Sequence, residues 1–149
     1  MSEQLVPDNF DVPARLETPL FVLEPLGPKH NESDHAAWSS SMEHIRATHG
    51  FTRRRWPRPI SSAENLADLE AHSADFETRS AFAYTVLDPG TRDVIGCVYL
   101  DPDPSGRADV AVRSWVRASH ADLDEPLRDA VVAWLGRDWP FRSVACPPE

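Results

Sequence analysis

Four arginines, at positions 53, 54, 55 and 58, lie close together in a chain that is acidic overall. They surround Trp56 in the stretch GFTRRRWPRPI, where one glycine and two prolines exclude regular secondary structure. Guanidinium groups bind carboxylates and phosphates through paired hydrogen bonds. Arg53, Arg54, Arg55 and Trp56 therefore predict a binding site for an anionic ligand or an acidic partner. A surface stripe that neutralises nearby acidic residues explains the same pattern equally well.

Three acidic residues, Asp122, Asp124 and Glu125, stand at the head of an expected helix in WVRASHADLDEPLRDAVVAWL. In many enzymes such a strand–loop–helix junction is rich in glycine and holds a phosphate, because helix N-termini favour anions. This junction contains no glycine. A carboxylate about 5 Å from a phosphate charge costs about 3 kcal/mol at an effective dielectric constant of about 20. We therefore interpret the acids as helix caps, formed by Ser119 with Asp122 or by Asp124 alone.

No metal ligands or reactive thiols are indicated. The six histidines are scattered, and no cysteine or carboxylate joins His44 and His49 at the spacing of a metal site. Cys97 and Cys146 lack the CxxC spacing of redox and zinc motifs, so we interpret them as small buried hydrophobic residues. The sequence therefore predicts no metal centre.

The periodicity of apolar residues predicts the elements that position these groups. Residues 1–19 form an irregular arm, and residues 20–26 form a first strand. Apolar spacings of three and four predict helices over residues 33–46, capped by Ser33 or Asp34, and 61–76, with Ser61 and Glu64 in a capping box. Alternation predicts strands over residues 82–88, 94–101 and 108–116, and then a helix (125–137) and a strand (141–146) follow.

The order β-α-α-β-β-β-α-β predicts an α/β fold with one mixed sheet. Three consecutive strands form an antiparallel meander, and the last helix makes a right-handed crossover to a parallel strand. A single domain over residues 20–149 accommodates all of these elements.

This order of elements resembles the GNAT N-acetyltransferase superfamily. The resemblance is carried by the strand VIGCVYL after a tight hairpin and by WVRAS at the end of the next strand, and it runs from LFVLEPL to FRSVAC. It implies acetyl transfer from acetyl-CoA to an amine. It also implies that strand 108–116 and the following loop hold the coenzyme. The residues assigned to it in this way are Arg113, Ser114, Trp115, Val116, Arg117, Ser119 and His120.

Amine acetylation requires a general base, and the resemblance points to Asp109, a carboxylate at the start of that strand. The chain departs from the family pattern in lacking the glycine-rich loop. It also lacks the family's C-terminal helix and two strands, with the tyrosine that protonates the departing thiolate; Tyr84 and Tyr99 fall in other strands. The edge left open at residues 141–146 predicts a homodimer.

Composition limits the partners that we expect. A net charge of −9 argues against nucleic acid and anionic membranes. The absence of a long apolar run and of a signal-peptide pattern predicts a cytoplasmic protein, and the usage of Arg, Ala, Asp and Pro indicates a bacterial origin. Two functions remain open. One is acetyl-CoA-dependent N-acetylation of a small-molecule or peptide amine. The other is a catalytically inactive GNAT-fold binding module that holds anions through residues 53–58.

Overall fold

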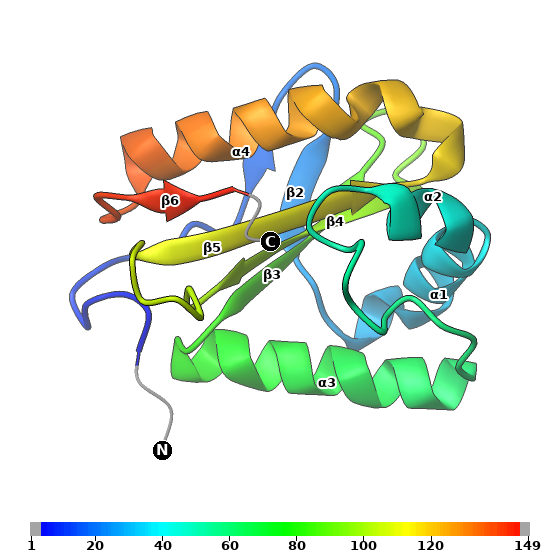
Figure 1. Cartoon of the computed structure of the whole chain (residues 1–149), viewed down its shortest axis with the longest axis horizontal. Coiled ribbons are helices and arrows are strands. Elements are labelled where there is room, and N and C mark those ends of the chain that lie inside the picture. The colour runs from blue at the N-terminus through cyan, green and yellow to red at the C-terminus, as the bar shows by residue number, and fades with distance from the viewer. Residues whose placement is uncertain (1–3, 147–149) are drawn as a thin grey trace.

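The computed structural model describes residues 4–146, and six strands in this part of the chain form one mixed sheet. Neighbouring strands are antiparallel, except for β5 and β6, which are parallel. The order across the sheet follows the chain. The α/β fold with a meander and a parallel crossover is therefore confirmed (Figure 1). The strands are β1 (Leu16–Glu17), β2 (Val22–Pro25), β3 (Phe82–Leu87), β4 (Val94–Asp101), β5 (Val110–Val116) and β6 (Val144–Ala145).

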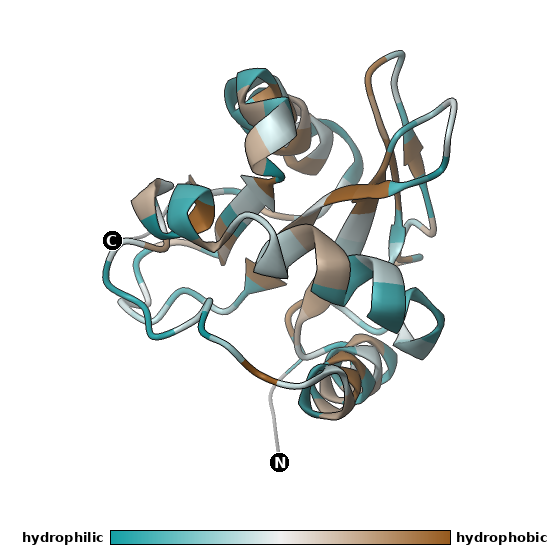
Figure 2. Cartoon of the chain, turned by 90° about the vertical axis from the view of Figure 1, so that its right-hand side faces the viewer, coloured by the Kyte–Doolittle hydropathy of each residue, from teal (hydrophilic) through white to brown (hydrophobic). Residues whose placement is uncertain are grey.

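Four α-helices cover the two faces of this sheet. Helix α4 (Asp124–Asp138) lies on one face, whereas α1 (Asn31–Ser39) and α3 (Ser62–Thr78) lie on the other (Figure 1). The short α2 (Met42–Ala47) lies beside α1. The long helices carry both hydrophilic and hydrophobic residues, as expected for helices with one face on a sheet (Figure 2). None of the helices in residues 4–146 combines the length and the apolar character that spanning a bilayer requires.

Each face of the sheet has its own hydrophobic core. On the α4 side, Val112 of β5 is buried in one cluster with Val131 and Trp134 of the helix. On the other side, Trp38 of α1 and Trp115 of β5 are fully buried in a second cluster. Alternate residues of the strands therefore serve two different layers, which explains why the central strands are apolar on both faces.

The helix predicted over residues 33–46 is interrupted, and this prediction was wrong in two respects. Helix α1 ends at Ser39 and α2 begins at Met42. The hydroxyl of Ser40 donates to the carbonyl oxygen of Ala37 at 3.0 Å, and such serine side chains compete with the helical backbone. The helix also begins at Asn31, so neither Ser33 nor Asp34 caps it. The capping box of Ser61 and Glu64 at α3 is confirmed.

The segment predicted as an irregular arm contains β1, which pairs with β2, so that prediction was also incomplete. Val6 is buried. The hydroxyl of Tyr84 donates to the carbonyl oxygen of Pro13 at 2.6 Å, and Arg79 donates to that of Phe10 at 2.7 Å. Residues 4–19 thus pack on the domain through specific contacts.

Candidate functional site

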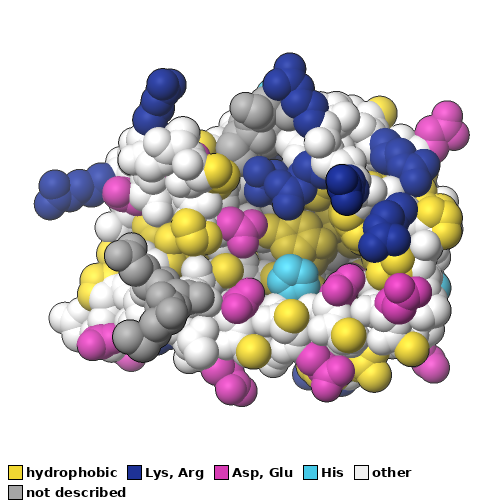
Figure 3. Space-filling model, turned by 60° about the horizontal axis from the view of Figure 1, so that its bottom comes forward, with side chains coloured by type: hydrophobic (Ala, Val, Ile, Leu, Met, Phe, Trp, Pro, Cys, Tyr) yellow, Lys and Arg dark blue, Asp and Glu magenta, His cyan; other side chains and the backbone are white. Residues whose placement is uncertain are grey.

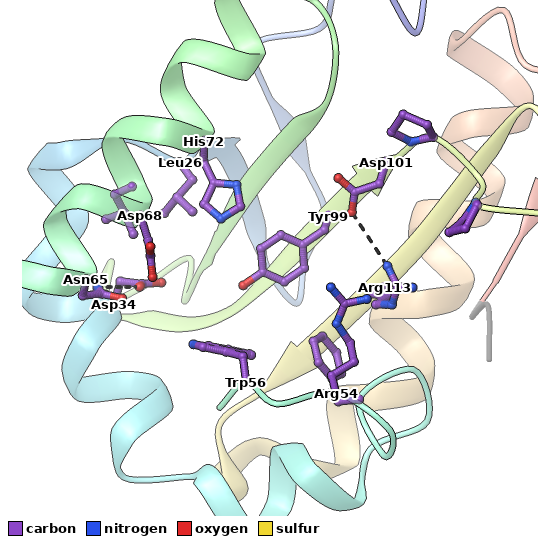
Figure 4. A pocket seen from close by; sticks show the side chains of 14 residues that line it. Leu26, Asp34, Arg54, Trp56, Asn65, Asp68, His72, Tyr99, Asp101 and Arg113 are labelled. Atoms are coloured by element: carbon purple, nitrogen blue, oxygen red, sulfur yellow. Dashed lines mark hydrogen bonds and ion pairs between the residues drawn. The ribbon is translucent and has the colours of Figure 1, made fainter. Parts of the chain in front are cut away.

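A cavity of about 460 Å³ lies on the sheet face that α1 and α3 cover. Its walls come from α1 and α3, from the loop between α2 and α3, from the end of β4 and from the middle of β5 (Figure 4). Figure 3 shows the hollow from outside, with hydrophobic side chains at its base, Lys and Arg side chains along one side, and Asp and Glu side chains along the other. The cavity is therefore a candidate binding site with opposite charges on its two sides.

The acidic end is formed by Asp34 of α1 and Asp68 of α3. Asp34 is only 4% exposed, and its carboxylate accepts a hydrogen bond from the Asn65 amide at 3.1 Å. Asn65 in turn accepts from the Trp38 indole at 3.1 Å, which fixes its orientation. Burial raises the pKa of Asp34 to about 6, although the Asn65 hydrogen bond opposes this shift. This carboxylate therefore ionises in a place that disfavours an unpaired negative charge.

The opposite end combines two arginines with a third carboxylate. The Arg113 side chain donates from Nε to the Gly50 carbonyl oxygen at 3.1 Å, and its Nη1 lies 3.8 Å from Asp101 Oδ2. Arg54 is exposed at the rim. Burial raises the pKa of Asp101, whereas the charges of Arg113, His72 and Arg54 lower it, and the net shift is upward. Asp101 is thus a carboxylate that can exchange protons nearer to neutral pH than an ordinary aspartate.

Aromatic side chains line the space between the two ends. The Trp115 indole donates to the Tyr99 hydroxyl at 3.0 Å. The rings of Trp56 and Trp115 lie 6.0 Å apart between centroids, and those of His72 and Tyr99 lie 5.6 Å apart. Trp56 and Tyr99 therefore offer ring faces to a ligand, and such faces attract cations as well as aliphatic groups.

The structure brings only part of the predicted arginine cluster to this cavity. Arg54 and Trp56 line it, whereas Arg53 and Arg55 are exposed and are not among the lining residues. The sequence pattern did not identify the acidic residues, or the other aromatic residues, that line the cavity with Arg54 and Trp56. A signal was present in α3, which supplies Asn65, Asp68, Leu69 and His72 at spacings of three and four.

Asp109, the base implied by the family resemblance, lies outside the cavity lining. It is exposed just before β5, and its carboxylate accepts from the backbone N–H groups of Arg142 at 2.7 Å and Ser143 at 3.3 Å. These bonds hold the start of β5 against the segment that leads into β6. The observed contacts of Asp109 thus connect two strands.

The residues assigned to the coenzyme follow β5 and the loop after it. Arg113 lines the cavity and Trp115 belongs to the core on that face, while Val116 belongs to the core beneath α4. Arg117 starts the 3₁₀ segment Ala118–Leu123. Its Nε is buried and has no hydrogen-bond partner among residues 4–146. The remaining members are Ser114, which is buried on β5, and Ser119 and His120, which bond to each other at 2.9 Å.

The head of α4 is closed by a contact from α2, and our capping interpretation was wrong. Leu123 occupies the N-cap position, and no side chain caps the helix. Instead, the carboxylate of Asp124 bonds to Nε2 of His44 at 2.9 Å. The backbone N–H of Ala118 donates to the hydroxyl of Ser41 at 2.9 Å. Helix α2 therefore contacts the loop where a diphosphate is expected.

These groups fit an acyl-coenzyme donor only in part. The orphaned Nε of Arg117 suits an anion, because a buried guanidinium N–H without a partner is costly. The carboxylate of Asp124 does not suit one, and no glycine exposes the backbone between Arg117 and Asp124. For metals, no group of three or more candidate ligands occurs within residues 4–146.

Comparisons with known proteins find similarity at the level of structure. No protein-family model matches the sequence, and no curated protein gives a significant match. A protein from Bordetella pertussis described as a GNAT-family acetyltransferase superposes with a TM-score of 0.59 at 19% identity, covering 84% of this chain and 74% of its own. Ribosomal-protein-S5-alanine acetyltransferase from Vibrio fischeri has a TM-score of 0.61 at 15% identity, over 84% and 67% of the two chains.

A third similar structure is the microcin C7 self-immunity acetyltransferase MccE in complex with acetyl-CoA and AMP. Its TM-score is 0.61 at 11% identity, and the match covers 83% of this chain and 67% of MccE. All three neighbours are described as acetyltransferases. At these identities the similarity concerns architecture, and the chain has the GNAT acetyltransferase fold.

Proposed function

We propose that the chain transfers an acyl group to an amine bound in the cavity. The observation that carries this proposal is the cavity itself, which is lined by Asp34, Asp68 and Asp101 and by aromatic side chains within the fold of acetyltransferases. Carboxylates and ring faces are the groups that hold an ammonium ion. Acetyl-CoA is the donor that we propose, because the similar MccE structure is a complex with it and the buried Nε of Arg117 has no hydrogen-bond partner among residues 4–146.

Asp101 is the base that we propose for this reaction. It accepts a proton from the bound ammonium, and the free amine then attacks the thioester carbonyl carbon. The carbon–sulfur bond breaks, and the second proton of the nitrogen passes to the leaving thiolate. A carboxylate with a raised pKa suits this task, because a base works best when its pKa is near the operating pH. Asp101 pairs in register with Ala111 of β5, on the strand implied to hold the donor.

Thermal unfolding in the presence of acetyl-CoA tests donor binding. A ligand at 100 times its dissociation constant stabilises a folded protein by about 2.7 kcal/mol, so millimolar acetyl-CoA should raise the midpoint by several degrees. Desulfo-CoA serves as a matched ligand without the thioester, and AMP as one without the pantetheine arm. An unchanged midpoint at millimolar acetyl-CoA would contradict the proposal.

A second function, ligand binding without catalysis, is favoured by one specific observation. The bond between His44 and Asp124 occupies the head of α4, where the coenzyme's diphosphate is expected. If acetyl-CoA does not bind while ligands of the cavity do, the chain is a GNAT-fold binding module. An anion held by the loop of residues 53–58 is then the first ligand to examine, with Arg54 as its contact in the cavity.

A further inference from the structure

Acidic and basic side chains lie at opposite ends of the cavity. This arrangement defines the class of ligand more narrowly than the amine already proposed. Figure 4 shows Asp34, Asp68 and Asn65 together at one end and Arg54 and Arg113 at the other, with Tyr99 and Trp56 between them. Asp101 lies beside Arg113, and His72 lies near Tyr99. A ligand with a single charge matches only one of the two ends.

The acidic end fits a cation and rejects an anion. Asp34 is buried and has Asn65 as a neutral partner, and the charge of Asp68 disfavours its ionised form further. Asp34 and Asp68 line the same end of the cavity, so a positive group there is attracted by both carboxylates. The charges of His30 and His35 lower the pKa of Asp34, and Asp34 in turn raises the pKa of Cys97 and of Tyr99. A protonated amine at this end supplies the positive charge that both carboxylates lack.

The basic end fits an amine and a carboxylate that lie close together. The guanidinium groups of Arg54 and Arg113 match the planar carboxylate, which accepts paired hydrogen bonds from arginine. Asp101 stands beside them and fits an ammonium group. An α-amino acid presents these two charges on one carbon atom, so its main-chain groups match the charges of all three side chains at once.

The middle of the cavity fits an uncharged aliphatic chain. Leu26 and Leu69 are buried and line the cavity together with Trp56 and Tyr99. Methylene groups are stabilised when such apolar walls remove them from water. A spacer of several methylenes would connect the two charged ends. The cavity volume of about 460 Å³ is within the range for small-molecule sites.

We infer that the acceptor is a free basic amino acid, with its α-amino and α-carboxylate groups at Asp101, Arg54 and Arg113 and its side-chain cation at Asp34 and Asp68. This inference rests on the proposed function for the α-amine as the acylated group. The binding mode itself does not require an acyl donor. In this binding mode, the charged side chains at each end of the cavity bind the ligand group of opposite charge.

Isothermal titration without any acyl donor tests the binding mode with four probes. L-lysine carries all three charged groups, norleucine lacks the distal amine, cadaverine lacks the carboxylate, and 6-aminohexanoate lacks the α-amine. We expect L-lysine to bind at least tenfold more tightly than each of the others. Equal affinities for all four probes, or no heat with L-lysine at millimolar concentration, would overturn the inference.

Matched variants test which charged group of the ligand binds at each end of the cavity. Asp68→Asn should weaken L-lysine at least tenfold and leave norleucine unchanged, whereas Glu70→Gln, on the same helix but outside the cavity, should change neither. Arg54→Gln should weaken L-lysine and leave cadaverine unchanged, with the neighbouring Arg53→Gln as its control. These four positions are exposed, so the variants should fold. Loss of L-lysine binding in a control, or none in Asp68→Asn and Arg54→Gln, would contradict the placement.

Transfer is measured separately, so the two proposals fail in different ways. Binding of L-lysine without acetylation of L-lysine or of any other amine contradicts the acyltransferase function and does not contradict the binding mode. If the chain acetylates other amines but does not bind L-lysine, only the inference that the acceptor is a basic amino acid is contradicted.

Discussion

At the scale of single residues, Asp34 links the cavity to the stability of the fold. Its pKa is raised to about 6 by burial, whereas an aspartate in an unfolded chain titrates near 4. The folded state therefore holds the proton more tightly, and stability falls as the pH rises through this window. The fall amounts to about 3 kcal/mol, at 1.36 kcal/mol per pKa unit.

Replacing the carboxyl with an amide removes this pH dependence. We expect Asp34→Asn to match the wild type near pH 4 and to be more stable by up to about 3 kcal/mol near pH 7. Urea unfolding of both proteins at the two pH values measures the difference. The same difference at both pH values would show that Asp34 ionises normally in the folded chain.

The second prediction at this scale concerns the base. Asp101→Asn should lower kcat by about 10²–10⁴-fold, because general base catalysis contributes about that much, and should also raise KM, because Asp101 is the proposed partner of the bound amine. Asp109→Asn should leave kcat within about twofold, because Asp109 bonds to Arg142 and Ser143 instead of lining the cavity. Steady-state kinetics of the two variants decide between the residues, and the reverse pattern would restore the base implied by the family resemblance.

The sequence predicted those site residues that lie together in one short segment. Arg54 and Trp56 stand out because charge and aromaticity are concentrated in one loop. Asp34, Asp68 and Asp101 come from three separate elements, and their meeting depends on how α1 and α3 pack on the sheet. A local pattern contains no information about that packing, so a helix-capping role for Asp34 was the natural but wrong interpretation.

At the scale of elements, α2 contacts the head of α4 through the bond between His44 and Asp124, beside the loop after β5. Removing the negative charge of Asp124 should strengthen CoA binding, by up to about 3 kcal/mol or roughly a hundredfold if the diphosphate lies about 5 Å away. We therefore expect Asp124→Asn to lower the Kd for CoA in calorimetric titration. Asp122→Asn removes an exposed charge two residues away and should have a smaller effect. Equal or weaker CoA binding by Asp124→Asn would exclude the diphosphate from this position.

Two glycines test the packing of elements with opposite expected results. A Cβ at Gly96 would lie 2.4 Å from the Trp115 carbonyl oxygen, so Gly96→Ala should force β4 and β5 apart and cost about 3 kcal/mol. A Cβ at Gly136 in α4 meets no atom within 4 Å, and Gly136→Ala should stabilise the helix by about 0.5–1 kcal/mol. Chemical denaturation measures both changes, and a tolerated alanine at position 96 would contradict the close approach of the two strands.

The elements themselves were largely predictable. The change of apolar period from about 3.6 to 2 located α3 and the meander, because these patterns follow directly from helix and strand geometry. The interruption after Ser39 was not predicted, since it depends on serine hydroxyls bonding to the backbone. Strand β1 has only two residues and pairs with β2 through tertiary contact, so it leaves no periodic signal.

At the scale of the whole molecule, the fold provides a charged cavity on one face of the sheet, which we propose for the acceptor, and a loop after β5, which we propose for the donor. The homodimer expected from the sequence stays a prediction, and sedimentation velocity at micromolar concentration would measure it. Strand β6 pairs with β5 at Val110 and Ala111 within the described residues, so a partner subunit would extend the sheet from β6.

Acyl transfer to an amine is measured most directly by mass spectrometry of small-molecule products. The chain is incubated with acetyl-CoA and a mixture of primary amines that includes basic amino acids, and acetylated products are quantified over time. The predicted result is an N-acetylated amine that forms with the wild type. Asp101→Asn should lower the rate of its formation at least about a hundredfold. Formation of acetylated amines no faster than in the protein-free reaction, with acetyl-CoA still intact, would contradict the proposed function.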